Sequence, residues 1–309
     1  MKNKIALIVP CYNEEPMIDL FYQDIQAYLD PKYDFWMVFV DDGSKDKTLE
    51  KILQLVAKDD HILYTSFSRN FGKESAMLAG LEIAQKINSD AAIIIDADLQ
   101  HPPVLIKDML AYYEQGIKHI YARQRSRKGA SLLNTFFARA FYRVYAFLTG
   151  FKDMQHGAVD FCLIDRDVID AFLSIKDYTR FTKGIFSFVG FEKKCLDFDY
   201  TPRIAGTTKW SFIKLWRYAF LGIKQFSRFY ILIPSLLSII AFIVFGIDLT
   251  LGIINQQVDY LALRIDGFSF LIFITIRYLM MLMYDMRDQS LNRPIYIKKE
   301  TNVDDKLHS

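Results

Sequence analysis

Apolar runs alternate with helix-like segments along residues 1–121. The apolar runs predict strands at residues 5–9, 35–40, 62–66 and 91–95, and the segments between and after them predict helices at residues 15–29, 47–58, 73–87 and 103–114. Regular alternation of this kind is typical of an α/β fold, in which right-handed crossovers connect a mostly parallel sheet. We therefore expect a nucleotide-binding half at residues 1–121.

The later part of the chain is much more apolar. Residues 229–247 carry no charge, and residues 268–284 are interrupted only by Arg277. At about 1.5 Å per residue, the first segment can cross a hydrocarbon layer about 30 Å thick, and the second can do so if its ends are extended. We expect two transmembrane helices within residues 229–284.

The charges around these segments predict their orientation. Residues 207–228 contain five basic and no acidic side chains, whereas residues 248–266 contain three Asp and one Arg. Basic residues favour the cytoplasmic side of a membrane. We therefore expect a multi-pass protein of the bacterial plasma (inner) membrane, with its first 200 or so residues facing the cytoplasm.

Residues 212–226 have apolar side chains at helical spacing with basic side chains largely opposite. This pattern is typical of an amphipathic helix in the membrane interface, and a core helix of the globular domain is the alternative. The predicted organisation is a cytoplasmic catalytic domain at 1–206, an interfacial helix at 207–228, a two-helix transmembrane region at 229–284 and a loosely held cytoplasmic tail at 285–309.

Composition excludes several classes of protein. A net charge of +2 argues against a nucleic-acid partner. No signal peptide is expected, because the first four residues lead directly into a strand. Three scattered cysteines are too few for a disulfide framework or a zinc site, and they suit a reducing compartment.

Two pairs of carboxylates follow predicted strands. Asp41 and Asp42 end the second strand, and Asp96 and Asp98 follow the fourth. Ligands of open α/β sheets gather outside the carboxyl ends of the strands. Because Mg²⁺ and Mn²⁺ prefer oxygen ligands and share them with substrate phosphates, these pairs indicate a metal-bound diphosphate. A solvated pair at a strand end is the simpler interpretation of either one alone.

Four motifs carry a family resemblance. They are VPCYNEE at 9–15, VDDGSKDKT at 40–48, FSRNFGKE at 67–74 and DADLQHPP at 96–103. In order and spacing they resemble the family 2 inverting glycosyltransferases, in particular the membrane branch that includes dolichyl-phosphate mannose synthase and the bacterial polyprenyl-phosphate glycosyltransferases. The resemblance implies a Rossmann-like domain of the GT-A type.

The resemblance also implies roles for residues on the donor side. The nucleoside pocket would be lined by Pro10, Tyr12, Glu14 and Asp42, and the diphosphate and its metal would be held by Asp96, Asp98 and Gln100. A strand-to-helix turn with an Asn cap is the structural alternative for residues 10–15. Residues 70–73 would open a helix whose free N–H groups favour an anion, and a well-capped helix start is equally open.

Residues 157–166 resemble the acceptor side of the family. Asp160 is the candidate general base or acceptor-orienting group, and an Asp that caps a turn is the alternative. The lipid phosphate would be bound by Arg123, Arg127, Ser131, Arg203 and Lys209. The family usually has Arg at the position of Cys162 and an acidic residue at the position of Ala130, and Arg180 matches a recurrent family Arg.

These features predict inverting transfer of one sugar, from a UDP-linked donor, to undecaprenyl or another polyprenyl phosphate, which supplies a lipid-linked sugar for modifying cell-envelope glycans. A phosphate monoester has a second pKa near ~6 and needs no base at neutral pH, so Asp160 is expected to position the acceptor. A processive polysaccharide synthase and a non-catalytic scaffold are the rivals. A homo-oligomer joined through transmembrane helices is one explanation of Arg277.

Overall fold

The computed structural model describes residues 2–125, 143–151, 158–178, 180–199, 220–223, 225–227 and 294–307, with isolated positions and short helical pieces between 243 and 290. Within these ranges, no helix is both long and apolar enough to cross a membrane. Most of the predicted transmembrane region lies outside the described residues, and Arg277 lies outside them as well.

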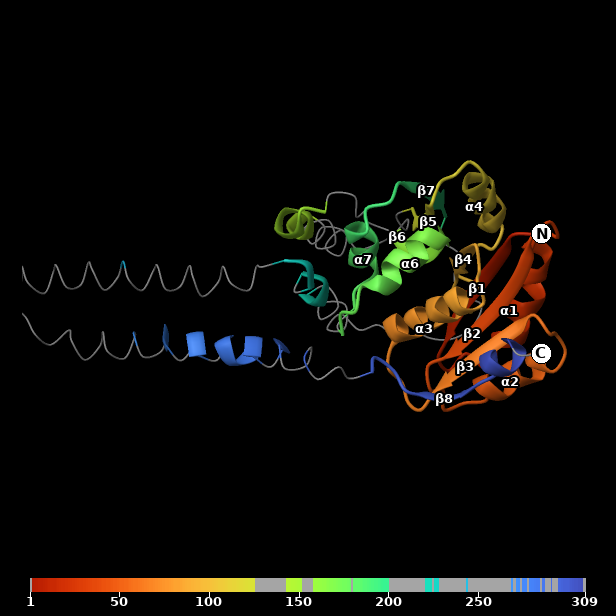
Figure 1. Cartoon of the computed structure of the whole chain (residues 1–309), viewed down its shortest axis with the longest axis horizontal. Coiled ribbons are helices and arrows are strands. Elements are labelled where there is room, and N and C mark those ends of the chain that lie inside the picture. Colours follow the sequence, from red (N-terminus) through yellow and green to blue (C-terminus); the bar gives the residue numbers. More distant parts are fainter. Residues whose placement is uncertain are drawn as a thin grey trace, which may run out of the picture.

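An eight-stranded sheet forms the centre of the domain (Figure 1). Its strands are β1 (Lys4–Cys11), β2 (Asp34–Asp41), β3 (Ile62–Phe67), β4 (Ala91–Ile94), β5 (His119–Gln124), β6 (Ala158–Asp165), β7 (Lys193–Phe198) and β8 (Lys298–Thr301). The spatial order is β7-β5-β6-β4-β1-β2-β3-β8, and only β6 and β8 run antiparallel to their neighbours. This confirms the predicted Rossmann-like, mostly parallel sheet and its first four strands.

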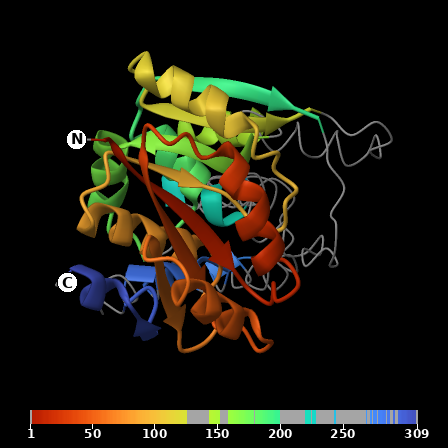
Figure 2. The same cartoon turned by 90° about the vertical axis from the view of Figure 1, so that its right-hand side faces the viewer.

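Helices cover both faces of the sheet (Figures 1 and 2). They are α1 (Ile18–Ile25) with the short η1 (Gln26–Tyr28), α2 (Thr48–Val56), α3 (Lys73–Lys86), α4 (Leu105–Glu114), α6 (Arg166–Ser174), α7 (Thr182–Phe188) and α11 (Val303–Leu307). α1, α2 and α4 pack on side chains such as Leu7, while α3, α6 and α7 pack on side chains such as Ile8. Because the central strands are buried on both faces, they appear in the sequence as unbroken apolar runs.

The topology places a crevice at the carboxyl ends of β1 and β4. β1 lies between β2 and β4. The chain adds β2 and β3 on one side of β1 and then crosses over to add β4 on the other side. This reversal of strand order is the usual binding position in open α/β sheets. β6 runs antiparallel beside β4, with Ile94 opposite Cys162. Two residues further on, the same register brings Asp96 opposite Asp160.

The C-terminal segment returns to the domain, so the prediction of a loosely held tail is wrong for residues 294–307. β8 pairs with β3, and the two lie side by side in Figures 1 and 2. The ring of Tyr296 stacks on Phe67 with 4.6 Å between centroids. Asn302 accepts the N–H of Tyr64 and donates to the carbonyl of Ile62, at 2.8 and 3.1 Å. The polar composition of this segment did not indicate these hydrogen bonds, because most of them involve backbone atoms, which are the same in every residue.

Part of the predicted interfacial helix packs on the domain. Its described residues 220–223, 225 and 226 are helical, and the ring of Phe226 lies 5.5 Å from Phe151 and 6.0 Å from Phe188. A Cβ on Gly184 would come within 2.5 Å of the Phe226 ring, so a helix glycine allows this contact. The final turn of that helix therefore shares an aromatic cluster with α7.

We expect Asn302→Ala to lower the free energy of unfolding by about 2 kcal/mol, because two buried backbone groups of β3 lose their hydrogen-bond partner. Thermal unfolding of the detergent-solubilised protein measures this. Lys299→Ala on the exposed surface of β8 is the control and should change little. Equal stability of Asn302→Ala and the unmodified protein would contradict the docking of this segment.

Candidate active site

The loops after β1 and β2 carry the residues predicted to bind the donor. The N–H of Asp42 donates to the carbonyl of Cys11 at 2.8 Å. Asn13 receives the N–H of Lys45 on its side chain and donates its own N–H to Ser44 Oγ, both at 2.9 Å. These bonds bring together the loops that carry the predicted nucleoside contacts, which are Pro10, Tyr12, Glu14 and Asp42.

Asp42 joins these loops to the start of α3. Its carboxylate accepts the N–H groups of Phe71 at 2.6 Å and Gly72 at 2.9 Å. Both N–H groups precede α3, which begins at Lys73 with Gly72 as its N-cap residue and has no side-chain cap. The anion expected at this helix start therefore stays a prediction. Burial raises the pKa of Asp42 to about 6, although the two N–H groups oppose the shift. The role of Asp42 in nucleoside binding stays a prediction.

Gly43 makes this arrangement sterically possible. Its φ is +66°, and a Cβ at this position would lie 2.3 Å from the carbonyl carbon of Arg69. Only glycine accommodates both the left-handed backbone and this close approach. The β2 loop can therefore reach the loop before α3, which is what aligns Asp42 with its two N–H donors.

Asp96 and Asp98 follow β4 at the same edge. The turn passes through Leu99, whose φ is +54°, an uncommon conformation for a non-glycine residue. Asp98 is 8% exposed, and its Oδ1 accepts the N–H of Gln100 at 3.1 Å. The predicted motif is thus held in a tight turn directly after β4.

Lys73 lies between the donor side and the acceptor side. Its Nζ contacts Asp96 Oδ1 at 2.7 Å and Oδ2 at 2.8 Å, and Asp160 Oδ2 at 2.8 Å. Burial alone would raise the pKa of the Asp160 carboxyl, but Lys73 and then Lys183 hold that pKa well below its usual range. Asp160 is therefore ionised. This role of Lys73 was not predicted from the sequence, where only the backbone N–H groups of residues 70–73 were assigned a function.

His101 packs beside Asp96. Its ring stacks on Phe161 with 5.6 Å between centroids, and its Nδ1 lies 3.9 Å from Asp96 Oδ2. Burial lowers the pKa of His101, so the imidazole is neutral at pH 7. The DADLQHPP motif thus places an uncharged ring under the acidic cluster, a role that our sequence analysis did not assign.

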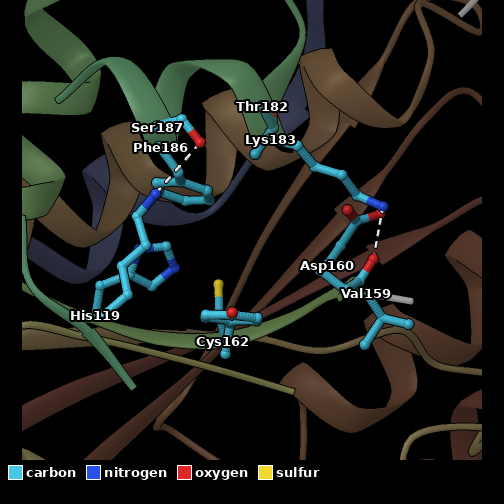
Figure 3. A pocket seen from close by; sticks show the side chains of 11 residues that line it. His119, Val159, Asp160, Cys162, Thr182, Lys183, Phe186 and Ser187 are labelled. Atoms are coloured by element: carbon cyan, nitrogen blue, oxygen red, sulfur yellow. Dashed lines mark hydrogen bonds between the residues drawn. The ribbon is translucent and has the colours of Figure 1, made fainter. Parts of the chain in front are cut away.

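A small cavity of about 50 Å³ adjoins Asp160, between α7 and strands β5 and β6. Figure 3 shows Asp160 and Lys183 at one end and His119 at the other, with Cys162 between them. Lys183 Nζ donates to the carbonyl of Ala158 at 2.7 Å. Burial, and then the nearby charge of Lys193, lower the pKa of His119 to about 3, so its imidazole is uncharged at neutral pH.

The predicted acceptor residues are described only in part. Arg123 forms a two-pronged pair with Asp197, at 2.6 and 2.9 Å. Arg180 is buried and donates to the carbonyls of Phe172 and Ile175, so it closes the C-terminal end of α6. The other predicted phosphate contacts lie outside the described residues, and they are Arg127, Ser131, Arg203 and Lys209.

The chemistry of the described acidic residues fits a metal that shares its ligands with a substrate. Asp96, Asp98 and Gln100 supply the oxygen atoms that Mg²⁺ and Mn²⁺ prefer. In the described part of the chain, no group of three or more His, Cys, Asp or Glu side chains could hold a metal alone. Any metal here needs further ligands, and a diphosphate provides them.

An α/β domain with acidic residues at its topological switch point belongs to the Rossmann-like class, in which ligands bind at that position. Residues 6–173 match the family described as Glycosyl transferase family 2, and the chain belongs to this family. It is therefore a glycosyltransferase, with the GT-A type of fold that the family motifs implied.

Several curated proteins are similar over most of the chain. An uncharacterized glycosyltransferase of Synechocystis is 39% identical over 74% of this chain and 70% of that protein. A prophage bactoprenol glucosyl transferase homolog of Escherichia coli is 37% identical over 73% of each. Among solved structures, glucosyl-3-phosphoglycerate synthase from Mycobacterium tuberculosis aligns with a TM-score of 0.49 and 16% identity over 72% of this chain and 80% of that chain.

We expect Asp42→Asn to stabilise the nucleotide-free protein at neutral pH. The folded state binds the Asp42 proton more tightly than the unfolded chain, whose pKa is near 3.8. The stabilisation from this group is therefore present below about pH 4 and lost as the pH rises to about 6.

At pH ~7.5 the variant should be more stable by about 3 kcal/mol, and at pH ~3.5, below the unfolded pKa, the difference should largely disappear. Urea unfolding at the two pH values measures this. A stability difference that does not change with pH would contradict the assignment.

Proposed function

We propose that this protein transfers one sugar from a nucleotide sugar to a polyprenyl phosphate at the cytoplasmic face of a membrane. The observation that carries the proposal is the meeting of Asp96 and Asp160 at one edge of the sheet, where both contact Lys73. The similarity to proteins named bactoprenol glucosyl transferase supports a lipid-phosphate acceptor.

The donor is proposed to be UDP-linked, with its nucleoside near Pro10, Tyr12, Glu14 and Asp42. Asp96, Asp98 and Gln100 would bind Mg²⁺ or Mn²⁺ together with the diphosphate. When bound, the metal supplies positive charge that stabilises the departing nucleoside diphosphate. The chain contributes the oxygen ligands and the tight turn at Leu99 that holds them.

The acceptor phosphate is proposed to attack the anomeric carbon directly. A phosphate monoester is largely dianionic above its second pKa of about 6, so it has no proton to lose. Asp160 is already ionised and paired with Lys73, which suits a group that orients the acceptor. A single in-line displacement inverts the configuration of the sugar.

The lipid phosphate needs positive charge beside Asp160. We propose that Arg127, Ser131, Arg203 and Lys209 provide it, because guanidinium groups bind phosphate oxygens in a planar fork and ammonium groups act as point charges. Arg123 would join them if its pair with Asp197 opens.

The membrane proposal is supported by the return of the chain to its sheet. β7 ends at Phe198 and β8 begins at Lys298, and both belong to one sheet. A segment between them that crosses a membrane must therefore cross it an even number of times, as two helices within 229–284 would. Several described apolar side chains of this region are exposed, including Leu279, Met280 and Met283.

A processive polysaccharide synthase is the main rival. Gln225 and Arg228 fall in a near match to the Gln-x-x-Arg-Trp motif of such enzymes, but Phe229 replaces the Trp. Two spans are also too few to enclose a polymer channel. A non-catalytic scaffold is disfavoured by the family's acidic motifs, which are present here.

Purified protein incubated with undecaprenyl phosphate, Mn²⁺ and a panel of nucleotide sugars should yield lipid carrying one added sugar, detected by mass spectrometry. Asp98→Ala should lower the rate by about 10²- to 10³-fold, because charge on the leaving group is less well stabilised. Asp108→Ala on exposed α4 is the matched control. Polymer, or nucleotide release without glycolipid, would contradict the proposal.

We expect Asp160→Asn to retain measurable transfer, within about tenfold of the unmodified rate, because the acceptor needs no base. Loss of general-base catalysis would instead cost about 10²- to 10⁴-fold. Initial rates at saturating lipid phosphate decide between these outcomes, with unchanged nucleotide binding as the check on folding.

A further inference from the structure

The ammonium group of Lys73 occupies the position that joins the two sides of the site. It contacts both oxygens of Asp96 and one oxygen of Asp160, all within 2.8 Å. The three side chains are only 30%, 25% and 20% exposed. Asp160 Oδ1 is buried and accepts no hydrogen bond from the described residues. Lys73 is therefore the direct counter-charge of two facing carboxylates.

This contact competes with a metal at Asp96. Both Asp96 oxygens already bind a cation, and a divalent ion that takes either oxygen must displace the ammonium or share the carboxylate with it. The other described acidic residues form no metal-binding group of three. The protein alone therefore offers few ligands to a metal while Lys73 keeps this position.

We propose that Lys73 is a resident counter-cation that keeps the affinity for divalent metal low until a nucleoside diphosphate is bound. This inference rests on the metal-assisted donor site of the proposed function, and it adds an order of binding. Metal enters with the nucleotide, whose phosphate oxygens supply the missing ligands. Lys73 is thus a positioning residue that acts through Asp96 and Asp160.

The local structure allows Lys73 to move. It is the first residue of α3, after Gly72 with a φ of +97°, so its side chain extends from a helix end into the crevice. A lysine ammonium is a compact charge on a flexible stem. An incoming diphosphate offers it new anionic partners close to Asp96, so the ammonium need not lose its counter-charge when the metal arrives.

The test measures Mn²⁺ binding without any sugar donor, by electron paramagnetic resonance of the free ion. In Lys73→Met the two carboxylates lose their cation, so Mn²⁺ should bind at least about tenfold more tightly than to the unmodified protein. Lys86→Met is the matched control. It removes a lysine of the same helix whose ammonium pairs with exposed Asp304, and its Mn²⁺ affinity should stay within about twofold.

A second measurement compares Mn²⁺ affinity with and without UDP. UDP should greatly increase Mn²⁺ affinity in the unmodified protein and increase it much less in Lys73→Met. Mn²⁺ alone should also raise the melting temperature of Lys73→Met more than that of the unmodified protein, because a ligand stabilises the folded state that binds it.

Lys73→Gln repeats the test if the methionine variant does not fold, and Lys73→Arg, which keeps the charge, should bind Mn²⁺ as weakly as the unmodified protein. Equal Mn²⁺ affinity of folded Lys73→Gln and the unmodified protein would overturn the proposal. None of these measurements uses the lipid acceptor. Failure of the glycolipid assay and failure of this inference are therefore distinguishable.

Discussion

Two carboxylates, Asp96 just after β4 and Asp160 in β6, approach each other at one edge of the sheet, and this arrangement is unfavourable without a cation between them. Lys73 provides that cation from the first turn of α3. Removing one partner of such a partly buried cluster leaves charge without compensation, which is far costlier than losing an exposed ion pair. The geometry of the donor and acceptor sides therefore depends on one ammonium group.

The start of α3 organises the rest of the site as well. The two N–H groups just before it, those of Phe71 and Gly72, are bound by Asp42, so the β2 loop is tied to the same turn. Glu74 accepts hydrogen bonds from the backbone N–H and the hydroxyl of Thr182, and these bonds connect α7 to the start of α3. Three consecutive residues, Gly72, Lys73 and Glu74, thus connect the β2 loop, the acidic crevice and the wall of the cavity beside Asp160.

The far end of the chain contributes to this support. β8 extends the sheet beyond β3, and Tyr296 packs on Phe67, just before the loop that leads into α3. The hydroxyl of Tyr296 also donates to Glu82 of α3. The segment that follows the apolar region is therefore anchored in the catalytic domain, on the strand and the helix that lead to the site.

The sequence by itself determined the fold class, because the central strands are buried on both faces and their unbroken apolar runs are visible in the chain. It also determined the acidic residues of the crevice, since Asp42, Asp96 and Asp98 follow those runs directly. Only the tertiary structure decided the partners. Asp160 reaches Asp96 because β6 inserts antiparallel beside β4, a long-range pairing with no local signal. The contacts of Lys73, the hydrogen bonds of Asp42 to Phe71 and Gly72 and the return of β8 likewise join residues far apart in the chain, and local pattern does not reveal such long-range contacts.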